Sequence, residues 1–266
     1  MQTQRNAISR VVAASCLVVV ATTVFVWSDE PPLEPVATFS ILGFDPVTGE
    51  VGGAVQSRVF SVGNGVLWAE ADVGVIATQA VVDVSYGPQG LALLKDGFTP
   101  SAVVKRLWED DTDPRPMRWT KQGRQFAVMN AAGVYAAFTG PKASAWAGHQ
   151  SGTYCTAQGN ILAGEEVLTN MVEAFERTDG HLSVRLMAAL DAGQAAGGDT
   201  RGMQSAAMII VKKNGGVWLN NDVVIRLQVD DAADPLAELR RLVEIAEHQR
   251  EPVSYTHLTL PTILLV

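Results

Sequence analysis

Hydrophobic and polar positions follow two different spacings along the central part of the chain. Short apolar runs bounded by glycine, proline or polar turns predict β-strands, and longer stretches with apolar residues three or four positions apart predict α-helices. The predicted strands cover residues 38–44, 50–57, 65–71, 73–82, both arms of a hairpin at 124–140, 152–160, 203–213 and 223–231. The predicted helices cover residues 86–97, 99–111, 164–180, 181–198 and 234–250.

The order of these elements predicts the fold class. Strands and helices occur in runs, whereas a parallel sheet needs single helices between successive strands. We therefore predict an α+β protein in which stacked antiparallel sheets are covered by layers of helices. Two of the helices have clear starts, because Thr99 and Asp234 can cap a helix and each is followed by a proline that fits the first turn.

The N-terminal segment differs in composition from the rest of the chain. Arg5 and Arg10 precede an apolar run over residues 11–27, which is the layout of an export signal. The run is also close to the length of a membrane anchor. We expect export to the periplasm or the exterior, with cleavage before Asp29, and an uncleaved anchor as the alternative. The acidic, proline-rich stretch up to residue 37 is expected to be an unfolded spacer.

The C-terminal segment is expected to be foreign to the protein. The stretch PVSYTHLTLPT back-translates into a transposase end sequence used in preparing sequencing libraries. We interpret residues 252–266 as adapter read-through and exclude His257 from functional arguments. One domain, residues 38–251, then remains.

Charge and composition exclude some functions. The chain has 266 residues and a formal net charge of −8, and no cluster of lysine and arginine that would suit nucleic acid. His149, His181 and His248 are scattered, so no metal site is expected, and no cofactor motif occurs. Cys155, a lone cysteine in TYCTAQGN, is expected to be a small buried residue.

Three polar stretches interrupt the apolar sequence at the ends of predicted strands. The first stretch, AVQSR, ends a strand with Ser57 and Arg58, and the second, AQGNILAG, contains Asn160. The third stretch, AGGDTRGMQSAA, contains Asp199, Arg201 and Ser205. Side chains at neighbouring strand ends can converge on one site, although each stretch alone could equally be a turn with local side-chain hydrogen bonds.

Several ordered segments together resemble the DUF1028 family of bacterial proteins. They are ATFSILGFDPVTGEVGGAVQSRVFSVG, GVIATQAVVDVSYGPQGL, AAFTG, AGHQSG, QGNILAG, AGGDTRGMQSAA and LQVDDAADPLAELRRL, and they extend from about Thr38 to Leu242. The resemblance implies an N-terminal-nucleophile (Ntn) hydrolase-like fold, a four-layer α-β-β-α sandwich. This expectation agrees with the layered order of the predicted elements.

The same resemblance implies a catalytic role for Thr38. In Ntn hydrolases the first residue of the mature chain is the nucleophile, and its α-amino group, with a reference pKa of about 8, is the base. Cleavage before Asp29 would leave Thr38 without a free amine, so a second cut after Ala37 would be needed. By analogy, Asn160 or a backbone N–H near Gly159 would stabilise an oxyanion, and Asp199 and Arg201 would orient the amine or bind a substrate carboxylate. Substrate contacts are expected from four side chains: Ser57, Arg58, Arg201 and Ser205.

Other functions remain open at this stage. The first hypothesis is an exported amidohydrolase or peptidase acting on a small molecule or peptide. The second is a non-catalytic binding or assembly module on the same fold, in which Thr38 is an ordinary β-branched strand residue. A third is a hydrolase that uses Ser57 or Ser205 with His149. The sequence also leaves open whether the chain forms a homo-oligomer.

Overall fold

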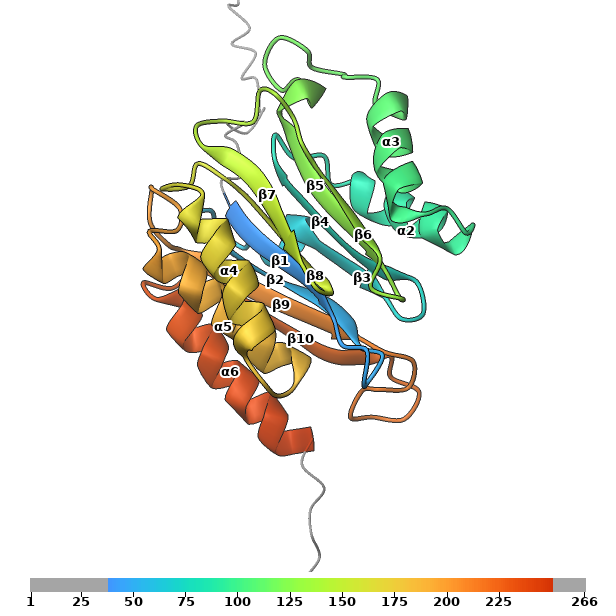
Figure 1. Cartoon of the computed structure of the whole chain (residues 1–266), viewed down its shortest axis with the longest axis vertical. Helices are drawn as coiled ribbons and strands as arrows, with labels where there is room; N and C mark the ends of the chain where they lie inside the picture. The colour runs from blue at the N-terminus through green and yellow to red at the C-terminus, as the bar shows by residue number, and fades with distance from the viewer. Residues whose placement is uncertain (1–37, 251–266) are drawn as a thin grey trace, which may run out of the picture. The chain divides into compact units, whose positions relative to one another are not determined.

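The computed structural model describes residues 38–250, which form ten strands and six α-helices (Figure 1). The strands are β1 (Thr38–Phe44), β2 (Val51–Ser57), β3 (Leu67–Glu70), β4 (Gly74–Ala80), β5 (Arg124–Asn130), β6 (Tyr135–Thr139), β7 (Ala147–Gly152), β8 (Cys155–Asn160), β9 (Ser205–Val211) and β10 (Val223–Val229). The helices are α1 (Gly63–Val66), α2 (Tyr86–Lys95), α3 (Pro100–Asp110), α4 (Glu166–Arg177), α5 (Leu182–Ala195) and α6 (Pro235–Arg250). The predicted leader, spacer and C-terminal read-through lie outside the described residues.

The strands form two antiparallel sheets, which confirms the α+β class. The larger sheet has the order β10-β9-β2-β1-β8-β7, and the smaller sheet has the order β3-β4-β5-β6. All strand pairs in the two sheets are antiparallel. β1 and β2 therefore occupy the centre of the larger sheet, where neither strand has a free edge.

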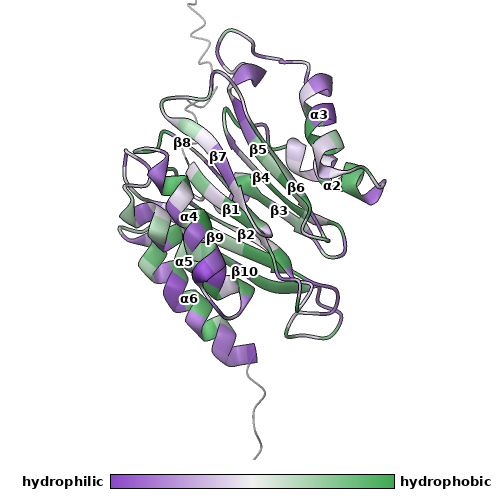
Figure 2. Cartoon of the chain, in the orientation of Figure 1, coloured by the Kyte–Doolittle hydropathy of each residue, from purple (hydrophilic) through white to green (hydrophobic). Residues whose placement is uncertain are grey.

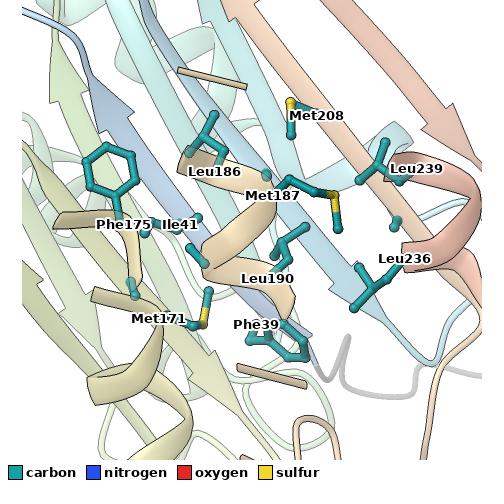
Figure 3. Packing of buried hydrophobic residues seen from close by; sticks show 14 of the residues in the cluster. Phe39, Ile41, Met171, Phe175, Leu186, Met187, Leu190, Met208, Leu236 and Leu239 are labelled. Carbon is teal, nitrogen blue, oxygen red and sulfur yellow. The ribbon is translucent and has the colours of Figure 1, made fainter. Parts of the chain in front are cut away.

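Three hydrophobic clusters fill the spaces between the layers of sheets and helices. One lies between the larger sheet and α4, α5 and α6, and Figure 3 shows Phe39 and Ile41 of β1 meeting Phe175 of α4 and Leu190 of α5 in it. A second cluster fills the space between the two sheets. A third lies between the smaller sheet and the helices α2 and α3. Both faces of each sheet are thus covered, which explains why β1, β2, β4 and β9 are buried at every position.

The hydropathy of the elements matches this arrangement. Figure 2 shows largely hydrophobic central strands and helices whose surfaces combine polar and apolar residues. Thr99 accepts a hydrogen bond from the N–H of Ala102, at 3.3 Å, and Asp234 accepts one from the N–H of Ala237, at 2.9 Å. Both predicted helix caps are confirmed.

Two elements were missed by the sequence patterns. α1 has only four residues and follows β2 after a short loop. β7, with the sequence AGHQSG, is an edge strand that pairs with β8 and is largely polar. An edge strand with few apolar residues carries no clear alternation, so periodicity could not detect it.

A buried cluster of charged side chains connects α5 and α6 to the start of β2 in the larger sheet. Glu50, just before β2, contacts His181 Nε2 at 2.7 Å and accepts a hydrogen bond from Arg250 at 3.0 Å. His181 also caps α5, and Arg250 ends α6. Burial raises the pKa of Glu50, but the hydrogen bond from His181 and the nearby positive charges outweigh burial and hold the pKa below its ordinary value.

Leu190→Ala tests the core between α5 and the larger sheet. Leu190 is fully buried, so removing its side chain should lower the free energy of unfolding by about 2–5 kcal/mol. Ile245→Ala on α6 is the control, because Ile245 is 44% exposed and should change stability much less. Urea unfolding followed by circular dichroism measures both. Equal losses in the two variants would contradict the packing described above.

Glu50→Gln tests the buried charge cluster through the pH dependence of stability. The pKa of Glu50 is lower in the folded chain, so its contribution is present above the unfolded-state value and is lost as the pH falls through the folded-state value. The stability difference between wild type and variant should therefore shrink on acidification below about pH 4.5. Thermal melts across the acidic range measure it, and a difference that stays constant with pH would rule out this role for Glu50.

Candidate functional site

Four polar residues form a straight row across the larger sheet. The strand registers place Asn160 of β8 opposite Thr38 of β1, Thr38 opposite Ser57 of β2, and Ser57 opposite Ser205 of β9. All four side chains are fully buried. Neighbouring strands run in opposite directions, so the starts of β1 and β9 lie beside the ends of β2 and β8. Four residues from distant parts of the chain therefore meet at one end of these strands.

The hydroxyl groups of this row have different partners. Thr38 Oγ1 lies 3.3 Å from Ser57 Oγ and donates to it. Ser205 Oγ donates to the carbonyl oxygen of Val59, at 2.6 Å, and accepts from the N–H of Val62, at 3.1 Å. Ser205 therefore fixes the loop after β2, whereas Ser57 is the hydroxyl in direct contact with Thr38.

Asp199 joins the loop after α5 to the end of β2. Its carboxylate accepts from the backbone N–H of Arg58, at 3.3 Å, and from Arg201 Nε and Nη2, at 3.2 and 3.0 Å. Asp199 is buried, so the two-pronged contact with Arg201 compensates a charge that would otherwise be costly to bury. The guanidinium of Arg58 instead donates to Gln204 Oε1, at 2.8 Å. This cluster lies beside the row of four residues, because Arg58 directly follows Ser57.

A network of buried amides connects the row to the smaller sheet. Gln79 of β4 and Gln125 of β5 are cross-strand partners, and Gln79 Nε2 donates to Gln125 Oε1 at 2.9 Å. Gln79 Nε2 also lies 3.4 Å from the carbonyl oxygen of Thr38, and Asn160 Nδ2 donates to Gln125 Oε1 at 3.2 Å. The backbone of Thr38 and the side chain of Asn160 are thus held by the opposite sheet.

The network continues through two further side chains of the larger sheet. Ser40 Oγ donates to Gln79 Oε1, and Gln158 Nε2 donates to Ser40 Oγ, each at 2.6 Å. Gln125 Nε2 donates to the carbonyl oxygen of Gly159, at 2.8 Å. The sequence patterns did not single out these glutamines. The available signal was a glutamine inside each of three apolar strands, because a buried polar group requires hydrogen-bond partners.

The remaining candidate residues lie away from the row. His149, on β7, has its Nδ1 3.0 Å from Thr139 Oγ1, and burial lowers its pKa. It therefore has a threonine partner rather than either of the serines, Ser57 and Ser205, that the third hypothesis requires. Cys155 is buried at the opposite end of β8 from Asn160, and burial raises its pKa to about 12. The expected burial of Cys155 is confirmed.

Metal and membrane features can be assessed only for residues 38–250. Within this range no three side chains of histidine, cysteine, aspartate or glutamate come together in a way that could hold a metal ion. None of the helices in the described part of the chain has the length and apolar character needed to cross a membrane.

Comparisons with known proteins give the family. The model of DUF1028, described as a family of unknown function, matches residues 38–239. The chain belongs to the DUF1028 family. Among solved structures, the crystal structure of the DUF1028 protein SPO2555 from Silicibacter pomeroyi is similar, with 32% identity and a TM-score of 0.70. That match covers 79% of this chain and 86% of the SPO2555 chain. No curated protein matches the chain.

The DUF1028 domain brings most of the predicted site residues together. Asn160, Thr38, Ser57 and Ser205 share one row, and Arg58, Asp199 and Arg201 form the cluster at its side. The polar side chains at the ends of the predicted strands therefore do lie close together.

Gln125→Leu tests the amide network of this DUF1028 domain. The change keeps the size of the side chain but removes the partners of Gln79, Asn160 and the Gly159 carbonyl, so unfolding should become easier by about 3 kcal/mol. Gln150→Leu on β7 is the matched control, since Gln150 is exposed. Urea unfolding of both variants measures the difference. If the two variants are equally stable, the network does not hold the sheets together.

Proposed function

We propose that the protein is an Ntn-type amide hydrolase in which Thr38 is the nucleophile. The observation that carries the proposal is the position of Thr38, which begins β1, begins the region matched by the DUF1028 model, and lies between Asn160 and Ser57 in the row. Two antiparallel sheets packed face to face, with helices on the outer face of each, support the four-layer α-β-β-α interpretation.

Chemistry at Thr38 requires cleavage of the peptide bond to Ala37. The freed α-amino group would accept the proton of Thr38 Oγ1 while Oγ1 attacks the amide carbonyl carbon of the substrate. The carbonyl oxygen becomes an oxyanion, and the side-chain amide of Asn160 or a nearby backbone N–H would stabilise it. The ammonium group then protonates the leaving amine, which departs as the C–N bond breaks. Water hydrolyses the resulting threonine ester and restores the hydroxyl.

The neighbouring side chains have supporting roles in this proposal. Ser57, whose hydroxyl is 3.3 Å from Thr38 Oγ1, would keep the nucleophile in position. Asp199 is already paired with Arg201, so it would act as a fixed negative charge near the new amine rather than as a base. Arg58 and Arg201 would contact a polar or anionic part of the substrate, and Ser205 would fix the adjoining loop.

A binding or assembly module on the same fold is the second candidate. The full burial of Thr38 favours it, because an uncleaved chain offers neither a free amine nor access to the hydroxyl. Export, or anchoring through residues 11–27, is proposed for either candidate, and so is a small-molecule or peptide ligand.

The mass and N-terminal sequence of the purified full chain distinguish the two candidates. The hydrolase proposal expects a mature chain that begins at Thr38. Such a chain should hydrolyse at least one member of a panel of N-acyl amino acids and peptide amides. Thr38→Ala should lower that rate at least about 10³-fold, because the nucleophile is lost. Thr169→Ala on α4 is the control and should retain the rate. A chain that begins at Asp29 or retains Met1 would favour the binding module.

A further inference from the structure

Four loops meet at the end of the sandwich that lies opposite to the polar row. The strand registers pair Val51 with both Phe44 and Val211, so the β1–β2 turn and the β9–β10 loop leave the larger sheet at the same end (Figure 1). The N–H of Phe44 donates to the carbonyl oxygen of Tyr154, at 3.0 Å, which places the β7–β8 turn there too. A Cβ at Gly133 would lie 2.5 Å from Phe44 Cδ1, so the β5–β6 hairpin also ends beside these loops.

Each of these four loops exposes apolar side chains to solvent. On the β9–β10 loop, Trp218 is 78% exposed, Leu219 is 92% exposed, and Val217 beside them is 53% exposed. The other three loops each add one exposed apolar residue, and these are Val47, Val134 and Tyr154. Single exposed apolar residues are ordinary on a protein surface, but a group of six at one end indicates a contact surface.

The β9–β10 loop holds its apolar residues outward in a defined turn. The N–H of Asn221 donates to the carbonyl oxygen of Trp218, at 3.2 Å, and the N–H of Gly216 donates to that of Asn221, at 2.8 Å. Asn221 Oδ1 also accepts from the N–H of Val223, at 3.0 Å. Because the loop satisfies its own backbone in this conformation, the exposure of Trp218 and Leu219 is part of the folded structure.

The tip of this loop carries no charge. Residues 214–221 read NGGVWLNN, and the nearest charged side chains, Lys213 and Asp222, are paired at the base of the loop at 2.9 Å. An uncharged tip with tryptophan and leucine suits the boundary between lipid headgroups and acyl chains. Tryptophan is enriched at that boundary, because its ring is apolar and its N–H stays near water.

The distribution of the apolar side chains favours a lipid surface over a folded protein. A stable contact between two folded proteins needs about 800 Å² of closely matched surface on each partner. Here three of the four loops contribute only one large exposed apolar side chain each. A fluid bilayer can accept separate tips without a matching shape.

We propose that this end of the domain binds the surface of a zwitterionic membrane, with Trp218 and Leu219 inserted beneath the headgroups. The net charge of −8 would oppose approach to an anionic membrane, so burial of apolar side chains rather than charge provides the affinity. The surface lies at the opposite end of the strands from Thr38, and the proposal does not depend on hydrolysis there.

Vesicles of phosphatidylcholine with brominated acyl chains test the proposal on the full chain. Bromine quenches tryptophan fluorescence only at short range, so it reports rings that reach the acyl chains. The vesicles should quench wild-type fluorescence by an amount that is missing in Trp218→Phe. Both chains contain the same residues 1–37, so any contribution from the N-terminal segment cancels in the difference. The quenching should persist at high salt, because screening does not weaken apolar burial.

Two further variants keep Trp218 as the reporter. Leu219→Ser should raise the lipid concentration for half-maximal quenching at least about tenfold, because a large apolar side chain no longer enters the membrane. Phe60→Ser is the control and should behave as wild type does. Phe60 is also apolar and 68% exposed, but it follows Ser57 at the other end of β2.

The proposal is wrong if wild type and Trp218→Phe are quenched equally, if high salt abolishes the quenching, or if Leu219→Ser leaves the lipid dependence unchanged. Sedimentation of the same proteins without lipid distinguishes a protein partner. A dimer that Leu219→Ser dissociates, together with no quenching by lipid, would assign this end to a second copy of the chain instead.

Discussion

The buried amide network between the two sheets is the constraint on which the candidate site depends. Gln125 of the smaller sheet bonds Asn160 and the backbone of Gly159 in the larger sheet. Gln79, its neighbour in the smaller sheet, bonds Ser40 and the Thr38 carbonyl in the larger sheet. A shift of one sheet against the other would therefore break several hydrogen bonds at once. Hydrophobic contacts alone would fix the relative position of the two sheets less well than these hydrogen bonds, because hydrophobic contact is non-directional. The amides thus fix the depth and register at which Thr38 begins β1, and any chemistry at Thr38 requires that position to be fixed.

The two ends of β2 have different physical roles. Ser57, at one end, meets the hydroxyl of Thr38, while Glu50, before the other end, is held by His181 and Arg250. The cluster around Glu50 connects β2 to α5 and α6, on the outer face of the sheet. The charge cluster therefore lies at the opposite end of β2 from the polar row. Substitutions in the charge cluster should change the stability of the fold rather than the geometry of the row.

The sequence predicted the elements and the convergence of the row well. Apolar runs identified β1, β2, β4 and β9 because these strands are buried on both faces. The polar residues of the row meet because, in an antiparallel sheet, the end of one strand lies beside the start of its neighbour. The pairing of Gln79 with Gln125 could not be predicted, since it depends on the register between strands far apart in sequence. The polar edge strand that contains His149 was missed for lack of periodicity.

The two edges of the sandwich are closed in different ways. At one edge, Thr139 of β6 and His149 of β7 are hydrogen-bonded, so the two sheets are bridged by side chains. At the other edge, β3 and β10 flank a cavity whose wall includes Trp68 and Arg226. An edge of this kind exposes both backbone and core, which is a risk for aggregation unless it is covered or charged. Arg226, exposed on the outermost strand, gives this edge a charge, which opposes edge-to-edge pairing with another chain.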